Sequence, residues 1–192
     1  MKSSIIDFLF EASALKRLKR TGWQILGGGN RESIAEHSYM VAVISYVLSV
    51  HSQLNLEKIL LMSLFHDFEE TRTGDVYKLA DLYTRTDKGK AIQDAFSILP
   101  QSAKITGLLE EYNQGKSLEA KLVKDADTLA LCLELTISIE NGNQNAEEWL
   151  KANLESLKTE AARELGKALV KSNSQNWWRK QRKILHKMIV KK

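Results

Sequence analysis

The stretch Phe65-His66-Asp67-Phe68-Glu69-Glu70-Thr71-Arg72-Thr73-Gly74-Asp75 places adjacent imidazole and carboxylate groups at the end of an apolar helix. The preceding residues, 56–64, are hydrophobic on most helical faces, so we expect His66 and Asp67 to enter a buried environment. A buried charge must pair with another charge or bind a metal ion. Because side chains three and four residues apart are neighbours on a helix, Glu70 lies beside both. These polar groups predict a functional site.

Two further segments offer polar groups on apolar helices. Residues 32–38 have the capping-box pattern, with Ser33 and Glu36 at the required spacing, and they place His37 just after the first turn of a helix. Residues 117–135 form a long apolar helical pattern into which Asp127 is set. Taken alone, either residue is more typical of a structural polar group. Together with the first segment, they supply the additional donors that a tightly held metal ion needs.

The order of these motifs resembles the four-ligand signature of the HD-domain metal-dependent phosphohydrolases: His37, then His66-Asp67, then Asp127. Residues 15–135 resemble the 5′-deoxynucleotidase branch of that superfamily more closely. The stretches that carry this likeness are Leu18-Lys19-Arg20-Thr21-Gly22-Trp23, Glu32-Ser33-Ile34-Ala35-Glu36-His37-Ser38, Glu70 with Thr73-Gly74-Asp75, and Val123-Lys124-Asp125-Ala126-Asp127. The resemblance implies an all-α, single-domain HD-domain helical bundle.

The resemblance also implies one divalent metal ion per chain, held by His37, His66, Asp67 and Asp127. Two nitrogen and two oxygen donors leave positions open for water and a phosphate oxygen on a metal that prefers five or six ligands. The absence of cysteine ligands argues against a closed structural zinc site. The donor set suits Mn²⁺, Co²⁺, Fe²⁺, Ni²⁺, Zn²⁺ or Mg²⁺ without choosing among them.

By the same resemblance, Glu70 and Asp75 are the catalytic acids beside the reacting water and the scissile phosphate, in either order of roles. Arg20 and Trp23 are candidate contacts to phosphate and nucleoside, because guanidinium matches phosphate geometry and indole can cover a base or sugar. A surface arginine and a core tryptophan are the competing interpretation. The glycine run at 27–29 departs from the family, which often carries an arginine there.

The predicted function is hydrolysis of (deoxy)nucleoside 5′-monophosphates to nucleoside and phosphate. One alternative is an HD hydrolase of a nucleoside triphosphate or a guanosine alarmone. The other is a non-catalytic nucleotide-binding or nucleic-acid-binding module that uses the basic ends of the chain. Acids beside an anionic phosphate disfavour a pure binding module.

Length and composition fit one helical domain over residues 1–192, with a motif core at about 15–135 and C-terminal packing helices at about 146–191. The chain has one proline, 43% hydrophobic and 27% charged residues, which excludes a disordered chain. The predicted helices span about 4–19, 34–50, 56–70, 90–98, 105–112, 117–141, 146–170 and 177–189. Residues 23–30 are predicted to be an extended connector, and residues 71–90 an irregular loop over the site.

Four smaller expectations concern single residues. Glu69 is predicted to be solvated, on the helical face next to Glu70. Asp125 points about 200° away from Asp127 on a helix, so it cannot easily share the same metal. Asn55 and Ser117 are predicted N-caps. The aromatic pair 177–178 is expected to anchor the last helix by apolar contacts.

The remaining expectations concern partners and location. The net charge of +4 reflects basic clusters near both ends; we interpret the C-terminal one as a solvated helix face and regard nucleic-acid binding as the minority interpretation. The C-terminal apolar stripe fits either intrachain packing or a homodimer interface, and we expect a homo-oligomer. A single cysteine, Cys132, and the lack of a membrane-spanning apolar run or signal-peptide pattern favour a cytoplasmic protein.

Overall fold

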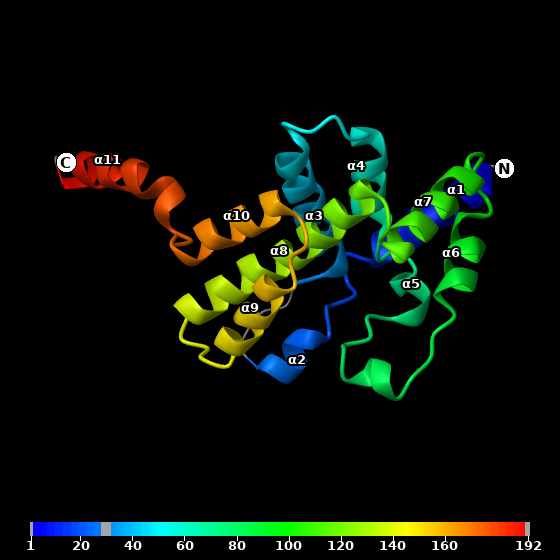
Figure 1. The fold of residues 1–192 in the computed structure, drawn as a ribbon, viewed down its shortest axis with the longest axis horizontal. Helices are drawn as coiled ribbons and strands as arrows, with labels where there is room; N and C mark the ends of the chain where they lie inside the picture. Colours follow the sequence, from blue (N-terminus) through cyan, green and yellow to red (C-terminus); the bar gives the residue numbers. More distant parts are fainter. Residues whose placement is uncertain (1, 28–31, 191–192) are drawn as a thin grey trace.

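The computed structural model describes residues 2–27 and 32–190, which fold into helices joined by short connections (Figure 1). The α-helices are α1 (Lys2–Ala14), α2 (Gly22–Leu26), α3 (Ile34–Ser49), α4 (Leu56–Phe65), α5 (Glu70–Thr73), α6 (Lys88–Phe96), α7 (Ser102–Gln114), α8 (Leu118–Glu140), α9 (Ala146–Glu155), α10 (Glu160–Val170) and α11 (Arg179–Val190). The 3₁₀ helices are η1 (Ala80–Leu82) and η2 (Asn176–Trp178). The predicted all-α fold is confirmed: within these residues no strand forms, only an isolated bridge between Lys19 and Ser33.

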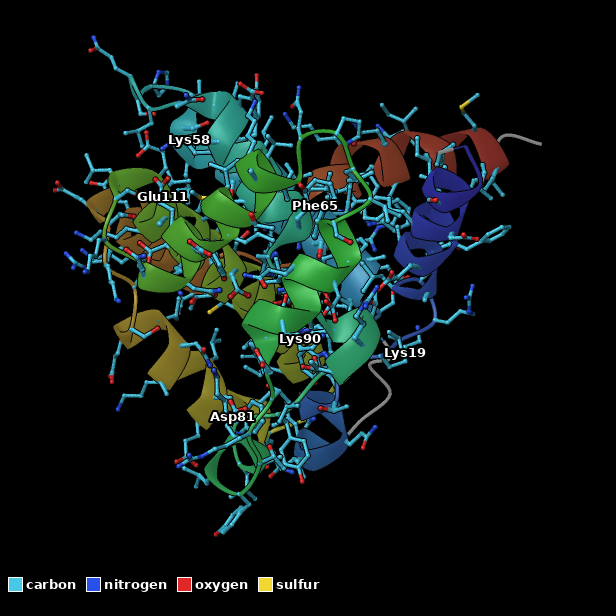
Figure 2. The ribbon with its side chains drawn as sticks, turned by 90° about the vertical axis from the view of Figure 1, so that its right-hand side faces the viewer. Lys19, Lys58, Phe65, Asp81, Lys90 and Glu111 are labelled. Carbon is cyan, nitrogen blue, oxygen red and sulfur yellow. The ribbon has the colours of Figure 1, made fainter. Side chains whose placement is uncertain are left out.

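The long helix α8 is the centre of the bundle and contacts α3, α4, α7, α9 and α10 (Figure 1). Small buried side chains at Ala120, Ala126 and Ala130 let the neighbouring helices approach closely. Toward the outer end of the bundle an ion pair joins α4 to α7, with Nζ of Lys58 2.8 Å from Oε2 of Glu111 (Figure 2). The main core therefore forms around one helix. It contains Val41, Ile44, Ile59, Met62, Leu108, Tyr112, Ala120, Leu122, Val123, Ala126, Leu129, Ala130, Leu157 and Ala162.

A second, aromatic core fixes the N-terminal helix against the segment that follows α4. Phe8 of α1 stacks on Phe68, with ring centroids 5.1 Å apart, and Phe96 of α6 packs against both. On the same side, Glu11 of α1 accepts hydrogen bonds from Oγ1 of Thr71 at 2.9 Å and from Nε of Arg72 at 2.6 Å. Thus α1 holds α5 by both apolar and charged contacts.

Capping residues begin the helices where the sequence predicts. Ser33 and Glu36 form a complete capping box at the start of α3. Asn55 caps α4 by accepting from the backbone N–H of Lys58, and Ser117 caps α8. These caps set the entry points of the three helices that surround the candidate site.

The predicted extended connector over 23–30 is wrong for its first part, because residues 22–26 form α2. Trp23 and Leu26 are three residues apart and both pack into a third core with Leu135 and Ala146. Burial of these two side chains outweighs the low helix propensity of glycine at the start. Residues 28–30 lie outside the described residues.

The predicted helix over 56–70 is also interrupted. α4 ends at Phe65, residues 66–69 form a turn, and α5 follows as a single turn of four residues. Gly74 ends α5 at φ 71°, a conformation that favours glycine. Phe65 and Phe68 both face the aromatic core, and the turn lets them do so while the polar residues between and after them face the site.

The C-terminal run splits into two helices, α9 and α10, instead of one over 146–170. The carboxylate of Asp125 explains the break. It accepts hydrogen bonds from the backbone N–H of Lys158 at 2.9 Å and of Thr159 at 2.6 Å, and from Oγ1 of Thr159 at 2.6 Å. Asp125 thus serves the connection into α10, as expected of a residue turned away from Asp127.

The prediction that the last helix packs on the domain is wrong for this chain. α11 has no buried residue, and Trp177, predicted as an apolar anchor, is 81% exposed. The first helix also ends early, at Ala14 instead of about residue 19. The predicted loop over 71–90 retains an irregular segment at 74–87 that contains η1 and carries the exposed Asp81 (Figure 2). Among the described residues, no helix has the length and hydrophobicity needed to cross a membrane.

We predict that Asp125→Ala lowers the free energy of unfolding by about 1–3 kcal/mol, because the backbone N–H groups of Lys158 and Thr159 lose the buried carboxylate that accepts their hydrogen bonds. Asp81→Ala, on the exposed loop, is the matched control. Urea unfolding of both variants, with and without a chelator, measures the effect independently of metal content. Equal midpoints for the two variants would contradict this role of Asp125.

Candidate functional site

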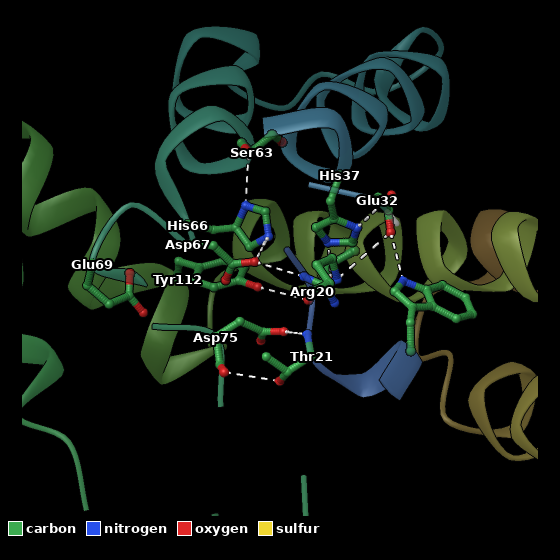
Figure 3. A network of polar contacts seen from close by, with 12 residues as sticks. Arg20, Thr21, Glu32, His37, Ser63, His66, Asp67, Glu69, Asp75 and Tyr112 are labelled. Carbon is green, nitrogen blue, oxygen red and sulfur yellow. Dashed lines mark hydrogen bonds and ion pairs between the residues drawn. The ribbon is translucent and has the colours of Figure 1, made fainter. Parts of the chain in front are cut away.

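Three of the four predicted metal ligands converge from three helices, and Figure 3 shows the two histidines among them side by side. His37 stands in the first turn of α3, His66 follows the last residue of α4, and Asp127 lies in the middle of α8. One donor atom of each lies within 4.8 Å of the others. This separation suits atoms that share one ion, so these three residues can hold a metal.

His66 is held in the tautomer that a metal requires. Its Nδ1 lies 2.9 Å from the carbonyl oxygen of Ser63 (Figure 3), and a carbonyl oxygen can only accept. Nδ1 therefore carries a proton, and in the neutral ring Nε2 keeps its lone pair. Nε2 is buried, and its polar neighbour is the carboxylate of Asp67, with Oδ2 3.1 Å away. A buried nitrogen so oriented fits a metal ligand.

His37 is oriented from both ring nitrogens. Its Nε2 lies 2.9 Å from Oδ1 of Asp127, and its Nδ1 faces Oε1 of Glu32 at 3.7 Å. The indole N–H of Trp23 donates to the other oxygen of Glu32 at 3.4 Å. Burial disfavours the charged imidazole, but Asp127 and Glu32 raise the pKa of His37 above its usual value. Glu32 thus supports a candidate ligand, a role that sequence reasoning missed.

Asp67 lies at the edge of this group. Its Oδ2 is 3.1 Å from Nε2 of His66 and also accepts from Nη1 of Arg20 at 3.1 Å (Figure 3). Burial opposes its ionisation, but His66 and Arg20 hold its pKa well below the usual range. Although burial disfavours the imidazolium, Asp67 raises the pKa of His66 to about 9. The carboxylates thus favour positive charge at Nε2 of His66, either as a proton or as a bound cation that displaces this proton.

Glu70 is buried and its Oε2 has no hydrogen-bond partner. Burial and the nearby carboxylates of Asp67 and Asp75 raise the pKa of Glu70 to about 10. A cation placed among these carboxylates lowers that pKa, so the protonation of Glu70 depends on what the site holds. This property suits a group that transfers a proton.

The prediction that Glu69 is solvated is wrong. Its side chain is buried, and Oε1 pairs with Nζ of Lys88 at 3.1 Å. The turn at 66–69 directs Glu69 inward, where an uninterrupted helix places it on the outer face. Lys88 begins α6, so this pair joins the site to the end of the irregular segment at 74–87.

Asp75 links that segment to the turn that carries Arg20. Its carboxylate accepts a hydrogen bond from the backbone N–H of Thr21, and its carbonyl oxygen accepts from Oγ1 of Thr21 at 3.0 Å (Figure 3). Arg20 precedes this residue and reaches Asp67. The structure therefore brings Arg20 and Asp75 to the predicted metal ligands.

Trp23 is only 5% exposed and belongs to the third core. Its predicted contact with a nucleoside stays a prediction, while its observed polar contact is with Glu32. Glycines 28 and 29, part of the run that departs from the family, lie outside the described residues.

Tyr112 of α7 is a second residue that sequence reasoning missed. Its hydroxyl donates to Oδ2 of Asp127 at 3.3 Å, and its ring meets the His66 ring edge to face at 5.6 Å. Nζ of Lys124 lies 4.4 Å from the centre of the same ring. The only sequence signal is an aromatic residue near the end of a helix, which is more often a core residue.

The donor set fits a divalent metal. Buried imidazole nitrogens that face carboxylates of lowered pKa are the arrangement that a cation stabilises. The pKa of Asp127 illustrates this: burial opposes ionisation, but His37 and His66 lower it to about 2. Imidazole and carboxylate donors suit several first-row metals and Mg²⁺.

Comparison with known proteins gives the same outline. The HD domain family matches residues 12–171. The human 5′-deoxynucleotidase HDDC2 is 31% identical over 137 residues, which cover 68% of this chain and 66% of that protein. The chain thus spans slightly less than two thirds of the human relative. A 5′-deoxynucleotidase of Yersinia pestis is 30% identical, with 82% of this chain and 84% of that protein covered.

A solved structure extends the likeness to three dimensions. A conserved hypothetical protein from Pyrococcus furiosus superposes with a TM-score of 0.76 at 34% identity, over 87% of this chain and 99% of that one. The similarity therefore includes nearly the whole of the archaeal protein, and it supports the helical architecture around the site.

We predict that the purified protein holds about one divalent metal ion per chain, because the donors converge on one position. His66→Ala and Asp127→Ala should each lose most of this metal and unfold at lower denaturant concentration. His51→Ala, on an exposed residue, is the control. Elemental analysis by mass spectrometry measures metal content; full occupancy in either variant would remove that residue from the ligand set.

Proposed function

Because this chain belongs to the HD-domain family, we propose that it is a metal-dependent phosphohydrolase that cleaves (deoxy)nucleoside 5′-monophosphates to nucleoside and phosphate. The observation that carries the proposal is the group formed by the buried His37 and His66 and the partly buried Asp127, with the guanidinium of Arg20 close to it. Side chains that can bind a metal ion therefore lie next to an arginine that can bind a phosphate. Phosphate hydrolysis requires both. The curated relatives described above supply the substrate class.

We propose that Asp67 completes the ligand set. Its Oδ2 already lies beside Nε2 of His66, and a small movement of Arg20 from Asp67 to the substrate frees that oxygen. A divalent ion bound there supplies a Lewis acid that lowers the pKa of water and neutralises phosphate charge. Arg20 then binds a phosphate oxygen.

Glu70 and Asp75 divide the proton transfers in this proposal. Glu70 is buried, lacks a partner on one oxygen and lies next to Asp67, so it can orient the attacking water and take its proton. Asp75, held by Thr21 at the margin of the site, would assist the departing nucleoside oxygen. The role of Glu70 is supported by the free oxygen of its carboxyl group. The role of Asp75 is supported by its fixed position on a connection near Arg20.

The finer parts of the proposal concern substrate and setting. Discrimination against the ribose 2′-hydroxyl is proposed from the names of the relatives, which are 5′-deoxynucleotidases. We further propose a homodimer and action in the cytoplasm; the buried, free thiol of Cys132 supports a reducing compartment. Product analysis distinguishes the alternatives, because a triphosphohydrolase or an alarmone hydrolase releases tripolyphosphate or pyrophosphate.

We predict that Glu70→Gln lowers kcat by roughly 10²–10⁴ while metal content stays normal, because the donors survive and only proton transfer is lost. Glu110→Gln, on an exposed residue of α7, is the matched control. Phosphate release and metal analysis on the same preparations separate chemistry from binding. Near-normal turnover in Glu70→Gln would reduce this residue to a neighbour of the metal.

We also predict rapid release of phosphate from a 5′-monophosphate and slow release from the matching 3′-monophosphate. Positioning selects the ester, because only one phosphate can lie in line with the attacking water when the nucleoside is held on the opposite side. Phosphate release from paired dAMP isomers, after chelation and readdition of single metals, measures this. Equal rates would overturn the nucleotidase assignment, whereas equal rates for ribose and deoxyribose would remove only the sugar preference.

A further inference from the structure

The C-terminal helix α11 carries an apolar face that nothing in its own chain covers. It extends away from the bundle (Figure 1), and none of its residues is buried. The apolar side chains recur on one side of the helix at spacings of one, three and four residues. They are Ile184, Leu185, Met188 and Ile189, each more than half exposed.

The direction of α11 is set by contacts at the end of α8. Glu140 accepts hydrogen bonds from Nδ2 of Asn173 at 3.0 Å and from the backbone N–H of Ser174 at 2.9 Å, and it also bonds the hydroxyl of Ser174. Next, Nε1 of Trp178 donates to Gln175 at 2.8 Å. The connection after α10 is therefore anchored, and it sends α11 outward instead of back along the bundle.

The same chain carries an apolar groove of about 410 Å³ between α3, α8 and α10. All of its lining residues except Ser172 are apolar: Met40, Val43, Ile44, Val47, Leu129, Leu133, Leu165, Ala168 and Leu169. The exposed row Tyr39, Val43, Tyr46, Val47 and Val50 continues the groove along the outer face of α3.

We propose that α11 of one protomer packs into this groove on a second copy of the chain, and that the second copy does the same in return. A symmetric dimer makes each contact twice, so both uncovered apolar surfaces are buried by a single partner. The lengths agree: α11 and the row from Tyr39 to Val50 each span twelve residues, about 18 Å at ~1.5 Å per residue. This is the helix-in-groove mode of recognition.

The expected area is that of a stable dimer. A fully buried aliphatic side chain removes roughly 60–120 Å² from water. Four such side chains on α11 and about as many on the groove, counted for two contacts, reach about 1,000–1,800 Å², near the range of specific interfaces. The basic residues Arg179, Lys183 and Lys187 lie on the opposite face of α11 and stay in water.

Other occupants account for less of the surface. A lipid membrane or a nucleic acid would use α11, with its basic and apolar faces, but would leave the groove between α3, α8 and α10 uncovered. Because the complementary surface is present on the same chain, a second copy is the partner that the observations favour.

The test begins with the solution mass of the full-length protein at micromolar concentration by light scattering. We expect twice the chain mass of 21.8 kDa. Leu185→Glu on α11 and Val47→Glu in the groove should each give a folded monomer. The control Val190→Glu introduces the same charge, also at an aliphatic residue of α11, but about 140° around the helix from Leu185, and should stay dimeric.

Mixing the two monomeric variants is the decisive step. A mixed dimer pairs the intact α11 of the Val47→Glu chain with the intact groove of the Leu185→Glu chain, so dimers should reappear. General unfolding of either variant cannot produce this result. A monomeric wild type, dimers that survive both substitutions, or monomers that persist on mixing would overturn the proposal. So would a monomeric wild type that binds anionic phosphatidylserine vesicles through Leu185.

Discussion

The 2.9 Å contact between Nε2 of His37 and Oδ1 of Asp127 joins residues that are 90 positions apart, and the rest of the bundle holds them together. His37 is fully buried and Asp127 is partly buried, and a lone imidazolium or carboxylate is costly away from water. The cost is offset only when His66, Asp67 and Arg20 lie close enough to balance the charges. Packing of α3 and α4 against α8 provides this proximity.

Supporting residues make the arrangement specific. The capping box starts α3 one turn before His37, so the cap fixes the position of that ring along the helix. Glu32 and Ser63 each orient one imidazole from the side away from Asp127. Tyr112 binds the second oxygen of Asp127 and leaves the first oxygen toward His37. Such second partners commonly decide how well a ligand binds metal.

The sequence predicted those parts of the site whose residues carry a local signal. His37, His66, Asp67 and Asp127 were singled out by charged groups on apolar helices and by the order of the motifs, and Glu70 and Asp75 were named by the resemblance to the HD-domain family. Glu32 and Tyr112 were missed because their contacts span the fold, and neither residue type is unusual where it stands. Glu69 was misplaced because the interruption of the helix at Phe65 depends on the aromatic core and not on local propensity.

The helices were predicted well where apolar spacing and capping residues agree, as in α3 and α8. They were predicted less well where burial against distant residues decides where a helix begins or ends. The short helix α2 depends on two side chains that enter a distant core. The break before α10 depends on the carboxylate of Asp125, which is more than thirty residues earlier. For α11 the amphipathic pattern was correctly identified, but such a pattern does not reveal whether the apolar face packs on the same chain or on another molecule.

The contacts of α1 with α5 give the first helix an influence on chemistry that it does not touch. Glu11 holds Thr71 and Arg72, and Phe8 stacks on Phe68, so the short segment bearing Glu70 is fastened on both sides to a distant part of the chain. The same support reaches the metal donors, because His66 and Asp67 share a turn with Phe68 and the backbone N–H of Ala35, at the start of α3, donates to the carbonyl of Leu15. Sequence changes in the N-terminal helix can therefore shift Glu70 and the donors beside it, although this helix contributes no side chain to the site.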